Sequence, residues 1–122
     1  MEKLFDSELK VMVPLWEDGP QTAGALAKRL AQSVGWNRNT TYTVIKKLID
    51  KGAVARSDPG FLCAALVSRE EVQRTETDSL ISRLFGGSRT QFLSAFLSEK
   101  DLTPAEAQQL RELIAAFSRE EK

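Results

Sequence analysis

Amide, hydroxyl and ammonium side chains recur three and four positions apart in the stretch GWNRNTTYTVIKKLIDKGAV, residues 35–54. If this stretch is a helix, with about 100° per residue, then Asn39, Tyr42, Thr43 and Lys46 share one face. Amide and hydroxyl groups can hydrogen-bond to the edges of DNA bases, and an ammonium group adds charge beside phosphates. The pattern therefore predicts a helix with one surface suited to nucleic acid.

The opposite face of this helix is apolar. Val44, Ile45 and Leu48 gather there and can dock on the rest of the protein, while Gly52 follows the last turn. Thr41 falls among the apolar residues. Its hydroxyl is therefore expected on the side of the helix that should be dry.

Basic residues are concentrated around the same helix. Residues 28–56 contain seven basic side chains against one acidic side chain, a net charge of +6, whereas segments 1–27 and 70–122 each carry −3 and the whole chain is neutral. The seven are Lys28, Arg29, Arg38, Lys46, Lys47, Lys51 and Arg56. A basic segment between acidic flanks predicts contact with a polyanion. Charge alone is equally compatible with a solvated, lysine-rich surface.

The composition argues against an enzyme. The chain has no histidine and one cysteine, which removes Ser-His-Asp and Cys-His catalysis and a structural zinc site. No phosphate-binding glycine motif is present, and we expect neither a cofactor nor a metal. A content of 42% apolar residues is enough for a core, without the run of about 20 that spans a membrane. The charged N-terminus and the single cysteine suit a cytoplasmic protein.

Three helices and a hairpin are expected in the first half of the chain. Asp6 or Ser7 is expected to cap the first helix, which Pro14 should bend or shorten, and Thr22 is expected to cap the second. The basic stretch is the third. Two short apolar runs flank the turn sequence SDPG at residues 57–60 and predict a β-hairpin. This order predicts a winged helix-turn-helix, in which the third helix enters the major groove and the hairpin lies along the DNA backbone.

Amphipathic helices are expected in the rest of the chain, with capping patterns at Ser68, Ser88 and Thr103. They are too few to cover one another's apolar stripes, so a homodimer should bury them. The residues assigned to that dimer are Leu80, Leu84, Phe92, Phe96, Leu110, Leu113 and Phe117. We expect a mainly α fold with a small β-hairpin: a winged helix-turn-helix DNA-binding domain at 1–68 and a helical dimerisation domain at 69–122.

Three segments of the chain resemble the BlaI/MecI/CopY family of bacterial repressors, which control penicillinase, methicillin-resistance and copper-transport genes. They are SELKVMVPLWEDGP, WNRNTTYTVIKKLIDKGAV and SLISRLFGGSRTQFLSAFL. The second is the most specific, because its Trp, T-x-x-T and K-x-L-x-x-K-G recur in the family. The resemblance implies a homodimeric repressor that binds a palindromic operator in double-stranded DNA.

By position, the resemblance places DNA contacts on residues of the third helix and the hairpin. These are Arg38, Asn39, Thr40, Tyr42, Thr43, Lys46, Lys47 and Arg56. Asn39, Thr40, Tyr42, Thr43 and Lys46 are the expected contacts of the recognition helix. Lys47 and Arg56 are assigned to phosphates, and a phosphate contact is also expected for Lys46.

The resemblance also implies a regulatory protease as a partner. In antibiotic-responsive members, a protease cuts before a phenylalanine of the dimerisation domain, and the matching bond here is Ala95–Phe96, with Ala where the family has Asn. The chain ends in FSREEK rather than in a cysteine-rich tail, so copper sensing of that type is not expected.

Two other functions fit the same sequence. A winged-helix protein-interaction module would use Tyr42 and the hairpin as a docking face. A ligand-sensing regulator would hold a small molecule between its C-terminal helices. Trp36 is expected in the core rather than on DNA, and Cys63 is expected as a small buried side chain.

Overall fold

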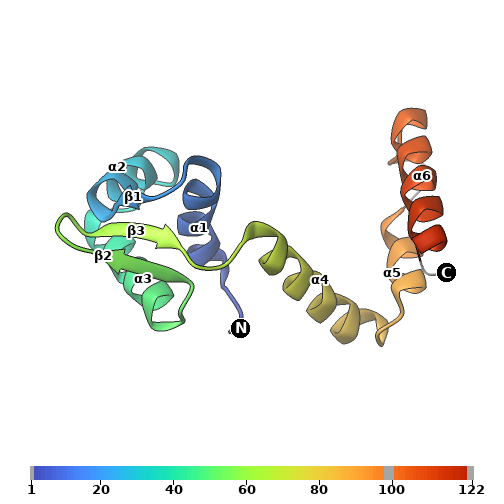
Figure 1. The fold of residues 1–122 in the computed structure, drawn as a ribbon, viewed down its shortest axis with the longest axis horizontal. Coiled ribbons are helices and arrows are strands. Elements are labelled where there is room, and N and C mark those ends of the chain that lie inside the picture. Colours follow the sequence, from blue (N-terminus) through green and yellow to red (C-terminus); the bar gives the residue numbers. More distant parts are fainter. Residues whose placement is uncertain (1, 98–100, 121–122) are drawn as a thin grey trace. The chain divides into compact units, whose positions relative to one another are not determined.

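The computed structural model describes residues 2–97 and 101–120, and the chain divides into two compact units, Met1–Thr77 and Asp78–Lys122. The first unit contains, in order, α1 (Asp6–Asp18), β1 (Gln21–Thr22), α2 (Ala23–Ser33), α3 (Arg38–Asp50), β2 (Val54–Ser57) and β3 (Leu62–Ala65). The remaining elements are α4 (Arg69–Phe85), α5 (Arg89–Phe96) and α6 (Pro104–Glu120), and α4 begins in the first unit. The mainly α fold with a small sheet is confirmed (Figure 1). A boundary between functional domains after residue 68 stays a prediction.

Side-chain caps set the starts of α2 and α3. The Thr22 hydroxyl accepts a hydrogen bond from a backbone N–H in the first turn of α2 at 3.1 Å, and the Asn37 amide oxygen does the same for α3 at 2.8 Å. The predicted cap of α1 at Asp6 or Ser7 is wrong, because both residues lie inside the helix and Phe5 precedes its first turn. Helix α1 continues through Pro14 to Asp18, so the proline does not shorten it. It ends at Gly19, whose φ of +82° is a conformation that glycine adopts without steric cost.

The sheet has one strand more than the sequence predicts. Strands β2 and β3 form the expected hairpin, and β1 pairs with the other side of β3, all antiparallel. A strand of two residues is too short to show an alternating pattern, so nothing in the sequence predicts β1. Cys63 of β3 lies between Gln21 of β1 and Arg56 of β2. This pairing ties the hairpin to the start of α2, and Figure 1 shows it beside the three helices.

The apolar face of α3 is buried, as predicted. Val44, Ile45 and Leu48 belong to one core with residues of α1, α2 and the hairpin. The other members of this core are Leu4, Val11, Met12, Leu15, Ala23, Leu26, Leu30, Ala53, Val54, Cys63 and Val72. Burying a side chain of this size contributes about 2 kcal/mol relative to leaving it in water. The core therefore fixes which face of α3 points outward.

The second unit leaves much of its apolar surface exposed. Phe92 packs against Phe85 and Phe96 with ring-centroid distances of 5.6 and 5.7 Å. Among residues 78–97 and 101–117, Ile81 alone is buried. The exposed large apolar side chains of this unit are Leu84, Leu93, Phe96, Leu113, Ile114 and Phe117.

Thr41 gives a direct test of the α3 packing. Its side chain is 0% exposed, and its hydroxyl has no hydrogen-bond partner among the described residues. A buried hydroxyl without a partner costs stability, whereas a methyl group of the same shape does not. We expect Thr41→Val to raise the free energy of unfolding by about 1 kcal/mol, measured by urea denaturation.

The matched control is Thr43→Val on the same helix. Thr43 is exposed and its hydroxyl already donates a hydrogen bond, so this change should not stabilise the protein. Equal stability of the two variants, or a loss for Thr41→Val, would show that the buried hydroxyl does have a partner in solution.

Candidate nucleic-acid interface

The polar face of α3 points away from the core. Of the residues assigned to DNA, those that are exposed are Arg38, Asn39, Thr43, Lys46, Lys47 and Arg56, and those that are half-buried are Thr40 and Tyr42. All of them come from α3 and the neighbouring strand β2 of the first unit. The structure thus brings the assigned side chains to neighbouring positions. The DNA contact of each stays a prediction.

Two threonine hydroxyls on this face already donate hydrogen bonds within the helix. The Thr43 hydroxyl donates to the backbone carbonyl of Asn39 at 2.8 Å, and the Thr40 hydroxyl donates to the Asn37 amide oxygen at 3.1 Å. A hydroxyl whose proton is engaged keeps lone pairs that can accept. These groups therefore meet a partner mainly as hydrogen-bond acceptors, and each also presents a methyl group.

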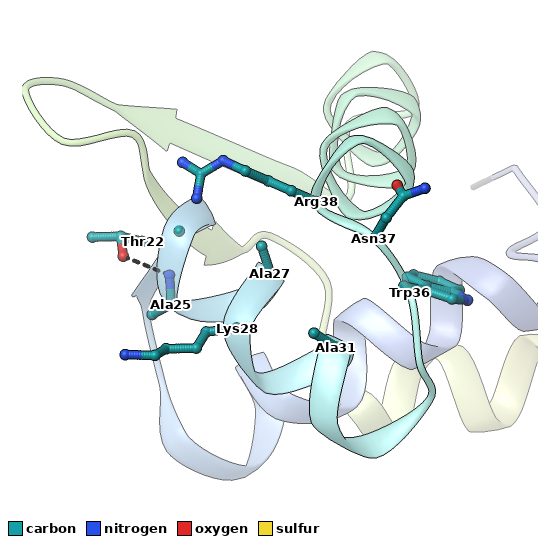
Figure 2. Close-up of a pocket in the computed structure, with 9 residues that line it drawn as sticks. Thr22, Ala25, Ala27, Lys28, Ala31, Trp36, Asn37 and Arg38 are labelled. Atoms are coloured by element: carbon teal, nitrogen blue, oxygen red, sulfur yellow. Dashed lines mark hydrogen bonds between the residues drawn. The ribbon is translucent and has the colours of Figure 1, made fainter.

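A groove of about 730 Å³ separates α2 from the start of α3 (Figure 2). Small side chains, including Ala27 and Ala31, line it together with two cations, Lys28 of α2 and Arg38 of α3. Small side chains leave room for a DNA strand to approach the protein backbone closely, and the two cations can bind its phosphates. Sequence reasoning counted Lys28 in the basic segment but did not assign it to the interface, because the α2–α3 groove is a tertiary feature.

A row of two aromatic rings with a cation at each end connects α3 with the hairpin. Arg38 lies 4.9 Å from the centre of the Tyr42 ring and donates a hydrogen bond to its hydroxyl at 2.8 Å. The Tyr42 ring meets Phe61 edge-to-face at 5.6 Å, and Arg56 lies 3.7 Å from the centre of the Phe61 ring. Tyr42 is thus engaged by protein groups on both sides, and Phe61 is a residue that the sequence did not single out. In the sequence, Phe61 is marked only by its place as an aromatic residue directly after the turn sequence SDPG.

The sequence of residues 4–116 matches the penicillinase repressor family. The chain belongs to that family. It is 22% identical to the penicillinase repressor of Bacillus licheniformis over 98% of this chain and 95% of that protein. It is 21% identical to the methicillin resistance regulatory protein MecI of Staphylococcus aureus strain N315 over 92% of this chain and 93% of that protein. The predicted membership of the BlaI/MecI family is confirmed.

A solved structure supports the same conclusion for the fold. The DNA-binding domain of the repressor BlaI superposes with a TM-score of 0.53 and 26% identity, covering 58% of this chain and 93% of that domain. The protein is therefore a BlaI/MecI-family transcriptional repressor with a winged-helix DNA-binding domain. Members of this family are regulators rather than enzymes, which agrees with the composition.

Ion pairs neutralise part of the positive charge around α3 in this repressor. Three of the seven basic residues between positions 28 and 56 are paired with carboxylates: Arg29 with Asp18, Lys51 with Glu8 at 2.7 Å, and Arg56 with Asp58 at 3.2 Å. Among the described residues, the cations near α3 without a carboxylate partner are Lys28, Arg38, Lys46 and Lys47. The outward positive charge is consequently smaller than the sequence count indicates.

The pair between Glu8 and Lys51 is part of the fold rather than of the DNA surface. The Glu8 side chain is 2% exposed and that of Lys51 is 16% exposed. The same carboxylate oxygen accepts from the backbone N–H of Phe5 at 2.8 Å, and the Lys51 ammonium also donates to the carbonyl of Lys3 at 2.7 Å. The pair thus joins the N-terminal segment and α1 to the end of α3.

The single thiol lies inside the hairpin. Cys63 is buried, and burial raises the pKa of its thiol, an effect that the nearby charge of Arg56 opposes. A raised pKa keeps the thiol protonated, which is unfavourable for a reactive cysteine. Cys63 therefore has the expected character of a small buried side chain.

The bond Ala95–Phe96 lies at the end of α5, where both residues are exposed, and cleavage there stays a prediction. No group of three or more His, Cys, Asp or Glu in the described part of the chain is placed to hold a metal ion. Within those same residues, no helix is both long and apolar enough to cross a membrane.

The Glu8–Lys51 pair predicts unequal effects of removing each partner. Lys51→Met leaves a buried carboxylate without its cation, so we expect the free energy of unfolding to fall by about 3 kcal/mol. Glu8→Gln should cost less, because the more exposed Lys51 side chain can turn toward water. Chemical denaturation of both variants measures the difference.

Lys47→Met on the same helix is the control for charge removal. Because Lys47 is exposed, Lys47→Met should change the free energy of unfolding by no more than about 0.5 kcal/mol. A loss for Lys51→Met as small as that of Lys47→Met would contradict the role of the pair.

Proposed function

We propose that this repressor binds a palindromic operator as a homodimer, with α3 in the major groove and the hairpin of β2 and β3 on the flanking DNA backbone. The observation that carries the proposal is the position of Asn39, Thr43 and Lys46 on the outward face of α3, held there by a buried apolar face. A helix presented in this way is the reading element of helix-turn-helix proteins.

The chemistry of this face supports a division of roles. Asn39 carries an exposed amide that can both donate to and accept from one base, the geometry that suits adenine. Thr43 offers lone pairs and a methyl group, because its hydroxyl proton is engaged by the Asn39 carbonyl. These features fit an amino group of adenine or cytosine, or the methyl group of thymine.

The cations around the outward face of α3 are assigned to DNA phosphates. Lys28 and Arg38 line the α2–α3 groove, Lys46 and Lys47 lie farther along α3, and Arg56 lies on β2. If each of the five neutralises one phosphate in each half of a dimer, the logarithm of the binding constant should fall with a slope of about −9 against the logarithm of salt concentration. A measured slope near −2 would exclude this footprint.

The homodimer is proposed from the exposed apolar surface of the second unit. Phe96 is 68% exposed, Leu113 54% and Phe117 63%. Apolar patches of this kind are uncommon on monomers and usually mark an interface. A second copy of the chain would cover them, and a two-fold dimer would present two α3 helices to the two halves of a palindrome.

Binding to the DNA upstream of its own gene tests the repressor proposal. We expect fluorescence anisotropy at physiological salt to show at least a thousandfold tighter binding to that DNA than to random DNA, which is typical of specific regulators. Equal affinity for both DNAs would refute the specific-operator proposal.

Two substitutions on α3 should separate sequence reading from charge. Asn39→Ala should weaken operator binding by about 1–3 kcal/mol and leave random DNA nearly unaffected, because it removes a base contact. Lys46→Ala should weaken binding to both DNAs similarly and reduce the size of the salt slope by about two, because both halves of the homodimer lose one phosphate contact.

Lys10→Ala is the control for removing a lysine. Lys10 is exposed on α1, outside the proposed interface, and should leave both affinities unchanged. Equal losses on both DNAs for Asn39→Ala would contradict its assignment to a base.

The dimer is tested by sedimentation. The native chain should sediment at about twice its mass of 13.6 kDa, and Leu113→Asp should shift it toward the monomer because a carboxylate is costly in an apolar interface. The control Gln108→Asp adds the same charge on another side of α6, where Gln108 bonds to Glu112 and Arg111. Monomeric native protein at micromolar concentration would contradict the dimer.

A further inference from the structure

Phe61 occupies an unusual backbone position at the base of the hairpin turn. Its φ is +51°, and no other non-glycine residue in the described part of the chain has a positive φ. Bulky residues rarely adopt this conformation, which persists where the surrounding structure holds it in place. The contacts of Phe61 with its neighbours must therefore stabilise this conformation.

Phe61 contacts each of the elements that face DNA in the proposed function. Its carbonyl accepts a hydrogen bond at 2.9 Å from the backbone N–H of Ala23, the first residue of α2. Its ring packs edge-to-face on Tyr42 of α3. On the hairpin, the Arg56 guanidinium lies 3.7 Å from the centre of the same ring.

The contact between Phe61 and Arg56 has a consequence for binding. A free arginine side chain samples many rotamers, and phosphate binding must remove that freedom. An aromatic face that already holds the guanidinium removes part of it in advance. Arg38 is held in the same way on Tyr42, so the two cations are placed at the two ends of one row of side chains.

The row also borders a hollow of about 420 Å³ between α3 and the hairpin. Its lining residues are Tyr42, Lys46, Ile49, Asp50, Arg56 and Phe61. A helix in the major groove and a hairpin on the flanking backbone must pass on either side of one sugar-phosphate strand. In the proposed complex that strand would pass between α3 and the hairpin, the two elements that line the hollow, so the spacing between Arg56 and α3 would decide whether both reach it.

We propose that Phe61 is a positioning residue for DNA binding, which holds the hairpin cation Arg56 at a fixed spacing from α3. The proposal rests on the proposed function, since it assumes that Arg56 meets a phosphate. Phe61 itself need not touch DNA. It acts through Arg56, and a substitution of Phe61 should be felt only when Arg56 is present.

The first test uses the free protein and does not depend on DNA. In the NMR spectrum of the full chain, the side-chain protons of Arg56 should be shifted upfield by the Phe61 ring. Phe61→Leu keeps an apolar side chain of similar size and removes the ring, so the shift should disappear while the rest of the spectrum is retained. Unshifted Arg56 protons in the native chain would overturn the proposal without touching the operator proposal.

The second test is a double-substitution cycle on the operator. Phe61→Leu and Arg56→Ala should each weaken binding about 3- to 10-fold and reduce the size of the salt slope, as expected when a phosphate contact is lost. The double variant should bind no more weakly than Arg56→Ala alone. Losses that multiply in the double variant, or an unchanged slope for Phe61→Leu, would overturn the proposal.

Two further variants complete the experiment. Phe61→Tyr retains the ring face, so the contact with the Arg56 cation is kept. This variant should bind the operator within about twofold of the native chain. Leu62→Ala truncates the next, exposed apolar residue and should leave the slope unchanged. If the native chain binds operator and random DNA equally, the operator proposal fails, whereas failure of Phe61→Tyr to restore binding contradicts the role of Phe61 alone.

Discussion

The orientation of α3 depends on its narrow apolar face. Val44, Ile45 and Leu48 are buried against α1, α2 and the hairpin, and exposing them would cost about 2 kcal/mol each. The exposed polar side chains of α3, such as Asn39 and Lys46, are solvated in the free protein. They would therefore gain little if the helix turned and exposed its apolar face. The display of Asn39 and Lys46 is therefore fixed before DNA arrives. A preorganised reading helix reduces the entropy that binding must remove.

The neutral total charge of the protein does not weaken a local basic interface. Screening at physiological salt limits exposed charges to a range of about 8 Å, so carboxylates on distant surfaces have little influence on α3. The nearby carboxylates matter more, and the structure shows three of them in ion pairs: Glu8, Asp18 and Asp58. One of these pairs is nearly buried and stabilises the end of α3, while the other two are exposed and contribute little to stability. The basic segment thus combines a structural cation with cations available to phosphate.

Features that depend on neighbours along the chain could be predicted from the sequence, and features that depend on distant contacts could not. The outward face of α3, the cap at Thr22 and the hairpin follow from spacing of three to four residues or from a turn sequence. The Glu8–Lys51 pair joins residues 43 positions apart, and the Tyr42–Phe61 contact joins two elements, so neither appears in a local pattern. A weak signal existed for Glu8, which shares the helical stripe of Met12 and Leu15 and therefore had to be buried. The expectation for Thr41 was local and proved accurate in its burial.

The exposed pair of Arg56 and Asp58 separates the tasks of the hairpin and of α3. A carboxylate 3.2 Å from the guanidinium competes with any phosphate for the same donor groups. Because operator and random DNA offer the same phosphates, this competition weakens both complexes by a similar free energy and leaves their ratio unchanged. In the proposed complex, discrimination would then come from groups that meet base edges, and those assigned to this role lie on α3. In the proposed complex, Arg56 of the hairpin would contribute to affinity alone, whereas α3 would contribute phosphate contacts to affinity and base contacts to sequence choice.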